Sequence, residues 1–249
     1  MKHLIVALFL FASSFAMADD FSVVREKLQK AMSADIRGED EKARDRNRNP
    51  IETLKFFGLK DNMKVVELIP GGGWYTKLLA PVLADKGELV VAIGATRVKE
   101  NLLDKPGFDK VKVSGEKSTF NRPEGARFYD LTIGGMDVKR ADMVLTFRNY
   151  HNFSAQGRKA MNEAAYKALK KGGIYGVVDH TARHMEPENA ENRRRIDPVL
   201  AIKEILEAGF EFVDYADMHY RPDDELRYEV GRATVKGNTD RFTLMFRKK

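Results

Sequence analysis

A run of glycines between an apolar segment and an amphipathic one constrains this chain more than any other feature. Residues 63–66 are mostly apolar and lead into Glu67, and glycines occupy positions 71–73 before the amphipathic segment 74–83. This order is typical of a strand, a loop and a helix, and glycines in such a loop let the backbone approach a ligand at the positive end of a helix. The pattern predicts a small-molecule site at the first strand-to-helix turn of an α/β sheet. A tight connection without a ligand is the alternative.

Strand-like and helical segments alternate through the rest of the chain. Helix-capping residues, such as Ser154 and Asp197, mark where amphipathic segments begin. We expect strands at 64–69, 88–93, 110–113, 142–147, 174–178, 210–216 and 241–247, a further extended piece at 127–133, and helices at 74–84, 154–171 and 198–208. Repeated units of this kind predict a mostly parallel sheet covered by helices on both faces.

Residues 1–18 have the pattern of a secretory signal peptide. Lys2 and His3 precede an apolar run at 4–15, and the tripeptide at 16–18 matches an A-x-A cleavage site. An uncleaved membrane anchor is the alternative, but the apolar run is too short to span a bilayer comfortably. We therefore expect cleavage before Asp19 and a periplasmic protein without a membrane span.

The composition excludes several classes of site. The sequence contains no cysteine, which removes disulfides, thiolate zinc sites, a cysteine nucleophile and a lipid anchor at the cleavage point. The formal charge is +6, but acidic and basic residues are interspersed, and no basic stripe alternates with aromatic residues. We therefore expect no nucleic-acid partner, whereas a small anionic ligand or substrate is compatible with the basic surface.

Residues 19–60 are expected to form a helical extension beside the main domain, which covers 61–249. Positions 21–34 carry apolar residues at helical spacing, and a charged run follows and ends before Pro50. Pro50 is favoured at the first position of a helix, and Gly58 is a typical stop. The charged run is most simply a solvated helix face.

Several motifs together resemble class I S-adenosylmethionine-dependent methyltransferases. Glu67, Gly71 and Gly73 match the family's first loop, and residues 141–145 and 170–173 match its fourth strand and the approach to its fifth. A narrower likeness, to an exported group of predicted methyltransferases, lies in residues 50–59, 71–76, 147–152 and 195–198. The resemblance covers roughly residues 50–249. It implies a Rossmann-like α/β fold with a seven-stranded, mostly parallel sheet and an antiparallel last strand. It also implies S-adenosylmethionine as cofactor, held by Glu67, Gly71, Gly73 and Trp74.

Two positions depart from the family's pattern. Ile69 stands where the loop normally has its first glycine, and Gly94 follows the second predicted strand, where a carboxylate normally holds both ribose hydroxyls. Losing two hydrogen bonds to a charged group, at about 1.5 kcal/mol each, weakens binding roughly a hundredfold. We therefore expect weak binding of S-adenosylmethionine.

The segment after the fourth predicted strand carries the candidate catalytic residues. Arg148 and His151 follow this strand at the carboxyl edge of the sheet, where open α/β sheets bind ligands. In the resembling enzymes this segment lines the reacting group, so His151 is the candidate general base and Arg148 the clamp for an anionic group. The alternative is that the polar side chains of this segment only hydrogen-bond the loop backbone.

Three other features yield no assigned site. His180 and His184 have the i, i+4 spacing of a helical metal site, but no glutamate and no third ligand accompany them, so we expect no metal. Asp179 and His180 are neighbours on a predicted strand and should point to opposite faces. Trp74, the single tryptophan, suits stacking on a planar ligand and the core equally well.

The leading functional prediction is methyl transfer from S-adenosylmethionine to a small acceptor. The alternative is a non-enzymatic periplasmic binding protein whose methyltransferase-like pocket holds another small or envelope-derived ligand. The polar, histidine-bearing segment after the fourth strand favours an enzyme, whereas Ile69 and Gly94 favour the alternative.

The expected cleavage site leads to a direct test. Intact mass spectrometry of protein from the native envelope fraction should give the mass of a chain that starts at Asp19, because signal peptidase cuts after the A-x-A motif. A full-length chain in the cytoplasmic fraction would contradict export. Because a periplasm has no obvious supply of S-adenosylmethionine, a cytoplasmic chain would also favour methyl transfer.

Overall fold

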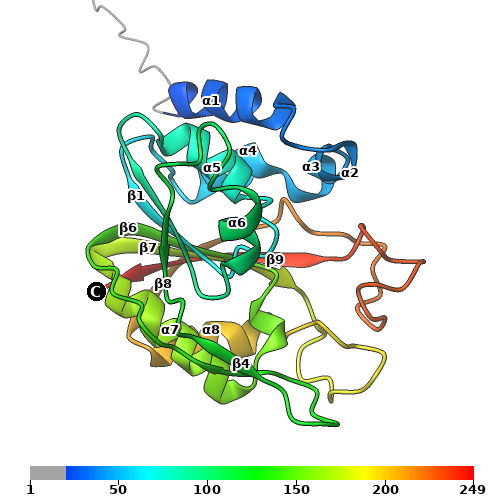
Figure 1. Ribbon diagram of the computed structural model, residues 1–249. Helices are drawn as coiled ribbons and strands as arrows, with labels where there is room; N and C mark the ends of the chain where they lie inside the picture. Colours follow the sequence, from blue (N-terminus) through cyan, green and yellow to red (C-terminus); the bar gives the residue numbers. More distant parts are fainter. Residues whose placement is uncertain (1–20) are drawn as a thin grey trace, which may run out of the picture.

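The computed structural model describes residues 21–249, and the predicted signal peptide at 1–18 lies outside the described residues. A sheet forms the centre of the molecule, and helices pack against both of its faces (Figure 1). The strand order is β3-β2-β1-β6-β7-β9-β8, and β4 pairs with β5 in a separate two-stranded sheet. The strands are β1 (Lys64–Leu68), β2 (Glu88–Ala92), β3 (Lys112–Ser114), β4 (Thr119–Asn121), β5 (Asp130–Thr132), β6 (Ala141–Phe147), β7 (Leu169–His180), β8 (Phe210–Ala216) and β9 (Arg241–Lys248).

The seven-stranded sheet reverses its strand order at β1. This strand pairs in parallel with β2 on one side and with β6 on the other, so that Val66 lies between Val90 and Val144. Strand β9 alone runs antiparallel, to both β7 and β8. The predicted fold, a mostly parallel sheet with an antiparallel last strand, is therefore confirmed. Because the order reverses at β1, the carboxyl ends of β1 and β6 diverge and leave a crevice for a ligand.

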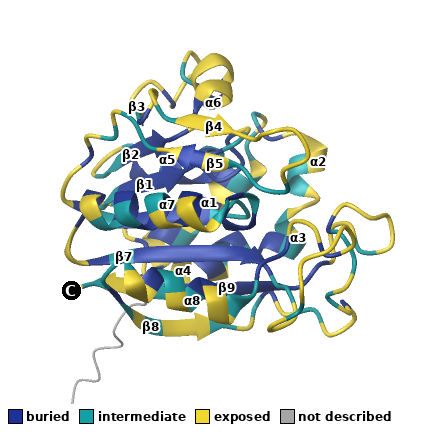
Figure 2. Ribbon diagram, turned by 90° about the horizontal axis from the view of Figure 1, so that it is seen from below, coloured by how far each residue is buried: buried dark blue, intermediate teal, exposed yellow. Residues whose placement is uncertain are grey.

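Helices cover each face of the sheet over its own hydrophobic core. Helices α1, α4, α5 and α6 lie on one face and α7 and α8 on the other (Figure 1). The helices are α1 (Ser22–Ser33), α2 (Glu39–Lys42), α3 (Asp45–Arg48), α4 (Pro50–Phe56), α5 (Thr76–Leu83), α6 (Thr96–Asn101), α7 (Ala155–Ala168) and α8 (Pro198–Glu207), with a 3-10 turn at Tyr150–Asn152. In Figure 2 the buried strands lie between helices that expose their outer sides. Within residues 21–249 no helix is both long and apolar enough to cross a membrane.

The segment predicted as a helical extension contains helices α1 to α4. Leu28 of α1 and Leu78 of α5 belong to the same core. The charged run does not form one solvated helix, because it divides into the short helices α2 and α3. Phe57, just after α4, packs against β7 so closely that a Cβ on Gly176 would lie 2.9 Å from its ring. These contacts join the extension to the core of the sheet.

The helix predicted at 154–171 ends earlier than expected. Its start is as predicted, because the Ser154 hydroxyl accepts a hydrogen bond from the Gly157 amide at 3.2 Å. However, α7 ends at Ala168, and β7 starts at Leu169, which pairs with Ala141 of β6. Pairing with a neighbouring strand therefore outweighs the local helical pattern of the next residues.

Candidate functional site

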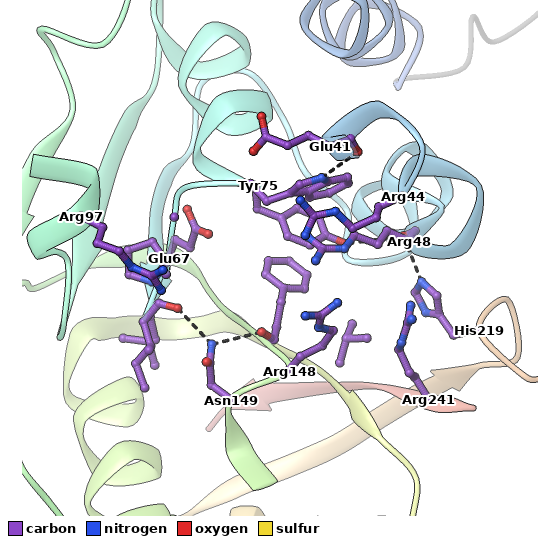
Figure 3. Close-up of a pocket in the computed structure, with 18 residues that line it drawn as sticks. Glu41, Arg44, Arg48, Glu67, Tyr75, Arg97, Arg148, Asn149, His219 and Arg241 are labelled. Atoms are coloured by element: carbon purple, nitrogen blue, oxygen red, sulfur yellow. Dashed lines mark hydrogen bonds between the residues drawn. The ribbon is translucent and has the colours of Figure 1, made fainter. Parts of the chain in front are cut away.

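A cavity of about 400 Å³ lies at the carboxyl ends of β1 and β6. The loop after β1 lines one side, the turn after β6 and the start of β9 line the opposite side, and residues of α2 and α3 close it from above (Figure 3). Its volume is in the range of small-molecule sites. The predicted site at the first strand-to-helix turn is thus a real hollow in the fold, and Glu67, Gly71, Trp74 and Arg148 all line it.

Glu67 closes the inner end of the cavity as a neutral carboxyl group. Its side chain is buried, and Thr76, at the start of α5, donates a hydrogen bond from Oγ1 to its Oε2 at 2.6 Å. Burial raises the pKa of Glu67 to about 8, although the Thr76 hydrogen bond acts in the opposite direction. At neutral pH this carboxyl group is therefore largely protonated and contributes little negative charge to the cavity.

The glycines of the loop serve two different purposes. Gly71 and Gly73 both have left-handed backbones, with φ of +61° and +82°. A Cβ on Gly71 would find only Arg97 Nη2 within 4 Å, at 3.6 Å, so this glycine leaves the backbone open to the cavity. A Cβ on Gly73 would lie 2.5 Å from Leu102 Cδ1, so Gly73 lets α6 pack against the loop. Only the first of these supports the predicted role in cofactor binding.

Three strand ends near the cavity carry non-glycine residues in the left-handed conformation. Ile69 after β1, Ile93 after β2 and Arg148 after β6 have φ of +53°, +62° and +60°. For β-branched isoleucine this conformation is a genuine outlier, with a cost of about 1–2 kcal/mol. Sheet hydrogen bonds hold it, since the Ile69 amide donates to the Ala92 carbonyl at 2.8 Å. Ile69 therefore keeps the backbone turn for which a glycine would be suited.

The surroundings of Gly94, the second position that departs from the family pattern, also differ from those of a ribose-binding site. The backbone of Gly94 has φ of +66°, and a Cβ there would lie 2.9 Å from Cζ of Phe120 on β4. None of the described residues that line the cavity belongs to β2. At the end of β2, the ring of Phe120 from β4 thus lies where the resembling enzymes have a ribose-binding carboxylate.

Aromatic rings form the wall above Arg148. Tyr75 stacks on Phe147 with 3.5 Å between ring centroids and 10° between planes. Trp74 is buried, and its Nε1 donates to the Glu41 carbonyl at 3.0 Å. The guanidinium carbon of Arg48 lies 4.3 Å from the Trp74 ring centroid, a cation–π contact. Trp74 therefore lines the cavity, but a protein cation already lies over its ring.

Arginines dominate the charge of the cavity. Arg44 and Arg48 at the two ends of α3, Arg97 of α6, Arg148 after β6 and Arg241 at the start of β9 gather around it (Figure 3). Burial lowers the pKa of Arg48 to about 9 and that of Arg241 to about 10, and repulsion from Arg148 is the next cause in both cases. Burial likewise lowers the pKa of Arg148. The site is thus strongly cationic.

His151, the candidate base, lies behind the cavity and does not line it. It is 5% exposed, its backbone amide donates to Asp179 Oδ2 at 3.0 Å, and its Nδ1 lies 2.5 Å from Asp179 Oδ1. The His180 amide also donates to Asp179 Oδ1, at 2.6 Å. These contacts tie the turn after β6 to the end of β7, and catalysis by His151 stays a prediction of the sequence alone.

The histidine that does line the cavity is His219, to which the sequence assigned no role. Its Nε2 lies 3.0 Å from the Arg48 carbonyl, and its Nδ1 lies 2.6 Å from Thr243 Oγ1. Burial lowers the pKa of His219 to about 4, so the ring is neutral, with Nε2 as donor to the carbonyl. Within residues 21–249 no group of three or more histidine, aspartate or glutamate side chains could hold a metal ion.

His151 and His184 form a matched pair for testing the structural role of Asp179. His151→Ala should lower the free energy of unfolding by about 2 kcal/mol, because it leaves a buried carboxylate with one partner fewer. His184 is exposed, and its Nδ1 lies 2.7 Å from Asp197 Oδ2. His184→Ala should therefore lower the free energy of unfolding by less than about 1 kcal/mol. Urea denaturation measures both, and equal stability of the parent and His151→Ala would contradict the structural role.

The raised pKa of Glu67 predicts how stability changes with pH. An acid whose folded pKa is about 8 and whose unfolded value is 4.5 destabilises the fold progressively as pH rises between these values. Glu67→Gln keeps the hydrogen bond with Thr76 but has no titrating group. Its free energy of unfolding relative to the parent should therefore rise by about 3 kcal/mol between pH 5 and pH 8. Ion pairs with Lys112 and Lys64 lower the pKa of Glu88 on β2, so the stability difference for Glu88→Gln should stay constant over this range. Urea denaturation at pH 5 and pH 8 measures both differences. An equally constant stability difference for Glu67→Gln and Glu88→Gln would contradict the raised pKa of Glu67.

Comparison with known proteins shows likeness in structure rather than in sequence. No protein-family model and no curated protein matches the chain. A SAM-dependent methyltransferase from Aquifex aeolicus matches with a TM-score of 0.55 and 16% identity, over 89% of this chain and 97% of that one. The glycopeptide N-methyltransferase MtfA matches with a TM-score of 0.52 and 13% identity, over 82% and 91%.

Two further findings accompany these matches. MtfA has also been solved in complex with S-adenosyl-L-methionine and with S-adenosyl-L-homocysteine. The [4+2]-cyclase SpnF matches with a TM-score of 0.51 and 14% identity, over 81% of this chain and 80% of that one. At sequence identities this low, the structural likeness shows the fold alone. The chain has the fold of class I S-adenosylmethionine-dependent methyltransferases.

Proposed function

We propose that this protein is a methyltransferase that acts on a small acceptor, with S-adenosylmethionine as methyl donor. The observation that carries the proposal is the turn after β1. There Glu67 is fixed by Thr76, and the open backbone at Gly71 faces a cavity of about 400 Å³ at the point where the strand order reverses. In open α/β sheets this is the place where ligands bind.

The described residues fit one end of the cofactor only. Gly71, Gly72 and Arg97 would hold its amino-acid end, and the bound cofactor would supply the methyl group. At the other end Gly94 supplies no carboxylate for the ribose, and Phe120 lies directly against it. Binding is therefore expected to be weaker than in a complete site.

Among the described residues that line the cavity, none offers the acceptor a free base. Glu41 forms an ion pair with Lys77 at 2.6 Å. Glu67 is largely protonated, and burial raises the pKa of Tyr75 to about 12. His219 has both ring nitrogens in contact with protein oxygens. An acceptor that is already nucleophilic without losing a proton suits this cavity best, with Arg148 to orient it if it is anionic.

The second candidate is a non-enzymatic binding protein that has kept the methyltransferase fold. The specific observation in its favour is the end of β2, where Gly94 and Phe120 replace the ribose-binding half of the site. Export, which we propose from residues 1–18, also favours it, because a periplasm has no obvious supply of the cofactor. The fold itself does not decide between the two, since a structural neighbour is described as a [4+2]-cyclase.

Titration calorimetry of the chain from Asp19 onward with S-adenosylmethionine separates these candidates. The incomplete ribose site predicts a Kd of about 0.1 mM, roughly a hundredfold weaker than a micromolar site. Absence of binding at millimolar cofactor would overturn the methyltransferase proposal in favour of the binding protein. Low-micromolar binding would support methyl transfer and contradict the incomplete ribose site.

A glycine pair controls for backbone strain in this measurement. Gly71→Ala should weaken cofactor binding, because a methyl group would stand on the open backbone of the loop. Gly107→Ala has the same left-handed strain, with φ of +86°, but lies outside the lining of the cavity and has nothing within 4 Å of its Cβ position. Both should lose about 1 kcal/mol of stability, and only Gly71→Ala should affect the Kd.

A further inference from the structure

Buried arginines in this protein fall into two groups. Five arginines are buried within residues 21–249, and three of them pair with a carboxylate. The pairs are Arg37 with Asp45 at 2.5 Å, Arg158 with Glu204 at 2.7 Å and Arg195 with Asp224 at 2.9 Å. This is the usual solution, because a charge removed from water is costly unless it is paired.

The other two buried arginines, Arg48 and Arg241, both line the cavity and have no carboxylate partner within the described part of the chain. They are 8% and 6% exposed, and the Nε atom of each is buried without a hydrogen-bond partner. Arg48 lies over Trp74, and Arg241 donates from Nη1 to the Asn47 carbonyl at 2.6 Å. Neither contact neutralises a positive charge.

Arg148 adds a third guanidinium to the same space (Figure 3). It is half-buried, and its repulsion is among the causes that lower the pKa of both Arg48 and Arg241. Three cations thus face one another across a cavity within the protein. Such an arrangement destabilises the fold unless a ligand of opposite charge completes it.

The acidic groups nearest the cavity are committed elsewhere. Glu41 forms an ion pair with Lys77 at 2.6 Å, and Glu67 is largely protonated at neutral pH. Asp179 attracts both Arg148 and Arg241, but it is one carboxyl group facing three guanidinium groups, and both of its oxygens already accept hydrogen bonds from the His151 and His180 segments. The protein itself therefore leaves most of the positive charge of the cavity without a counter-charge.

We propose that this cavity binds a compact small molecule with at least two negative charges, which Arg48, Arg148 and Arg241 hold by charge-assisted hydrogen bonds. Guanidinium groups bind carboxylate and phosphate oxygens in pairs, so phosphate esters and polycarboxylates share the chemistry required. Exposed Arg44 and Arg97 lie at the rim and would attract such an anion from solvent. The inference goes beyond methyl transfer and does not depend on it.

Two of the three arginines, Arg48 and Arg241, are positioned before any ligand arrives. Trp74 supports Arg48 from one side, and His219 holds the backbone carbonyl of the same residue. The carbonyl of Asn47 fixes Arg241. Because these side chains are already ordered, little conformational entropy remains to be lost on binding, which favours affinity for an anion of matching size.

The single tryptophan provides a direct readout of this site, since the guanidinium carbon of Arg48 lies 4.3 Å from the Trp74 ring centroid. Pyrophosphate and citrate serve as multivalent probes, with acetate as the monovalent control at constant ionic strength. We expect Trp74 fluorescence to change saturably with a multivalent probe below about 1 mM, and the melting temperature to rise with it. Acetate should produce neither effect.

Two charge-matched substitutions on β9 locate the binding site. Arg241→Gln should weaken binding of the multivalent probe by about tenfold to a hundredfold, because it removes a charged hydrogen-bond donor. Arg247→Gln removes the same charge at the other end of the strand, where Arg247 pairs with exposed Glu211, and should leave the Kd within about twofold. Arg148→Lys, which keeps the charge and the fold, should also weaken binding because it loses the planar fork.

Arg148→Gln should have opposite effects on stability and on binding. In probe-free buffer it should raise the melting temperature, because it removes an unpaired cation, and it should abolish stabilisation by pyrophosphate and citrate. The proposal is overturned if neither probe binds, if acetate acts equally well, or if Arg241→Gln and Arg247→Gln bind alike. None of these titrations contains S-adenosylmethionine, so their failure would leave the methyltransferase proposal untouched.

Discussion

The parallel pairing of β1 with both β2 and β6 determines where every other part of the site lies. Val66 at the middle of β1 is flanked by Val90 and Val144, which fixes the register of the central strands. With that register, the loop after β1 and the turn after β6 emerge side by side. Asn149 then joins them, since its Nδ2 donates to the Ile69 and Phe147 carbonyls at 3.0 Å each. The cavity is the space that these two turns leave between them.

Several features around the cavity cost stability, and they occur together. Ile69, Ile93 and Arg148 have left-handed backbones at three strand ends, and Glu67 is a carboxyl group buried in neutral form. Backbone strain of this kind persists where surrounding structure holds it, and such outliers concentrate at functional sites. Elsewhere in the described chain, buried arginines have carboxylate partners, as Arg195 has Asp224. The concentration of unpaired charge and strain at one edge of the sheet is the mark of a ligand site.

Local sequence patterns were sufficient for the parts of the site that are built from consecutive residues. The strand, glycine loop and helix around Glu67 follow from hydrophobic periodicity and glycine positions, and so do the fold and its antiparallel last strand through the family resemblance. The end of α7 was predicted wrongly, because pairing of Leu169 with Ala141 depends on a distant strand. Short local windows contain no information about such pairings.

The cationic character of the cavity could not be predicted in the same way. His219 contacts the carbonyl of Arg48 across 171 positions of sequence, and Arg241 contacts Asn47 across 194. No motif in the sequence marks these residues, because His219 and Arg241 are single basic residues in a chain where 32% of residues are charged, and Arg48 lies within a charged run whose pattern most simply indicates a solvated helix face. Conversely, the sequence predicted His151 as a general base at the site, but its partner Asp179 comes from the neighbouring strand and holds it in the interior.

The central claim is that the arginine-lined cavity is completed by an anionic small molecule. Its most direct test is mass spectrometry of small molecules released from protein isolated at low ionic strength from its native compartment, with the Arg148→Gln variant isolated in parallel as background. The account predicts a stoichiometric compound with at least two acidic groups that is depleted in the variant. A bound compound without acidic groups, or one that the variant retains in equal amount, would contradict it.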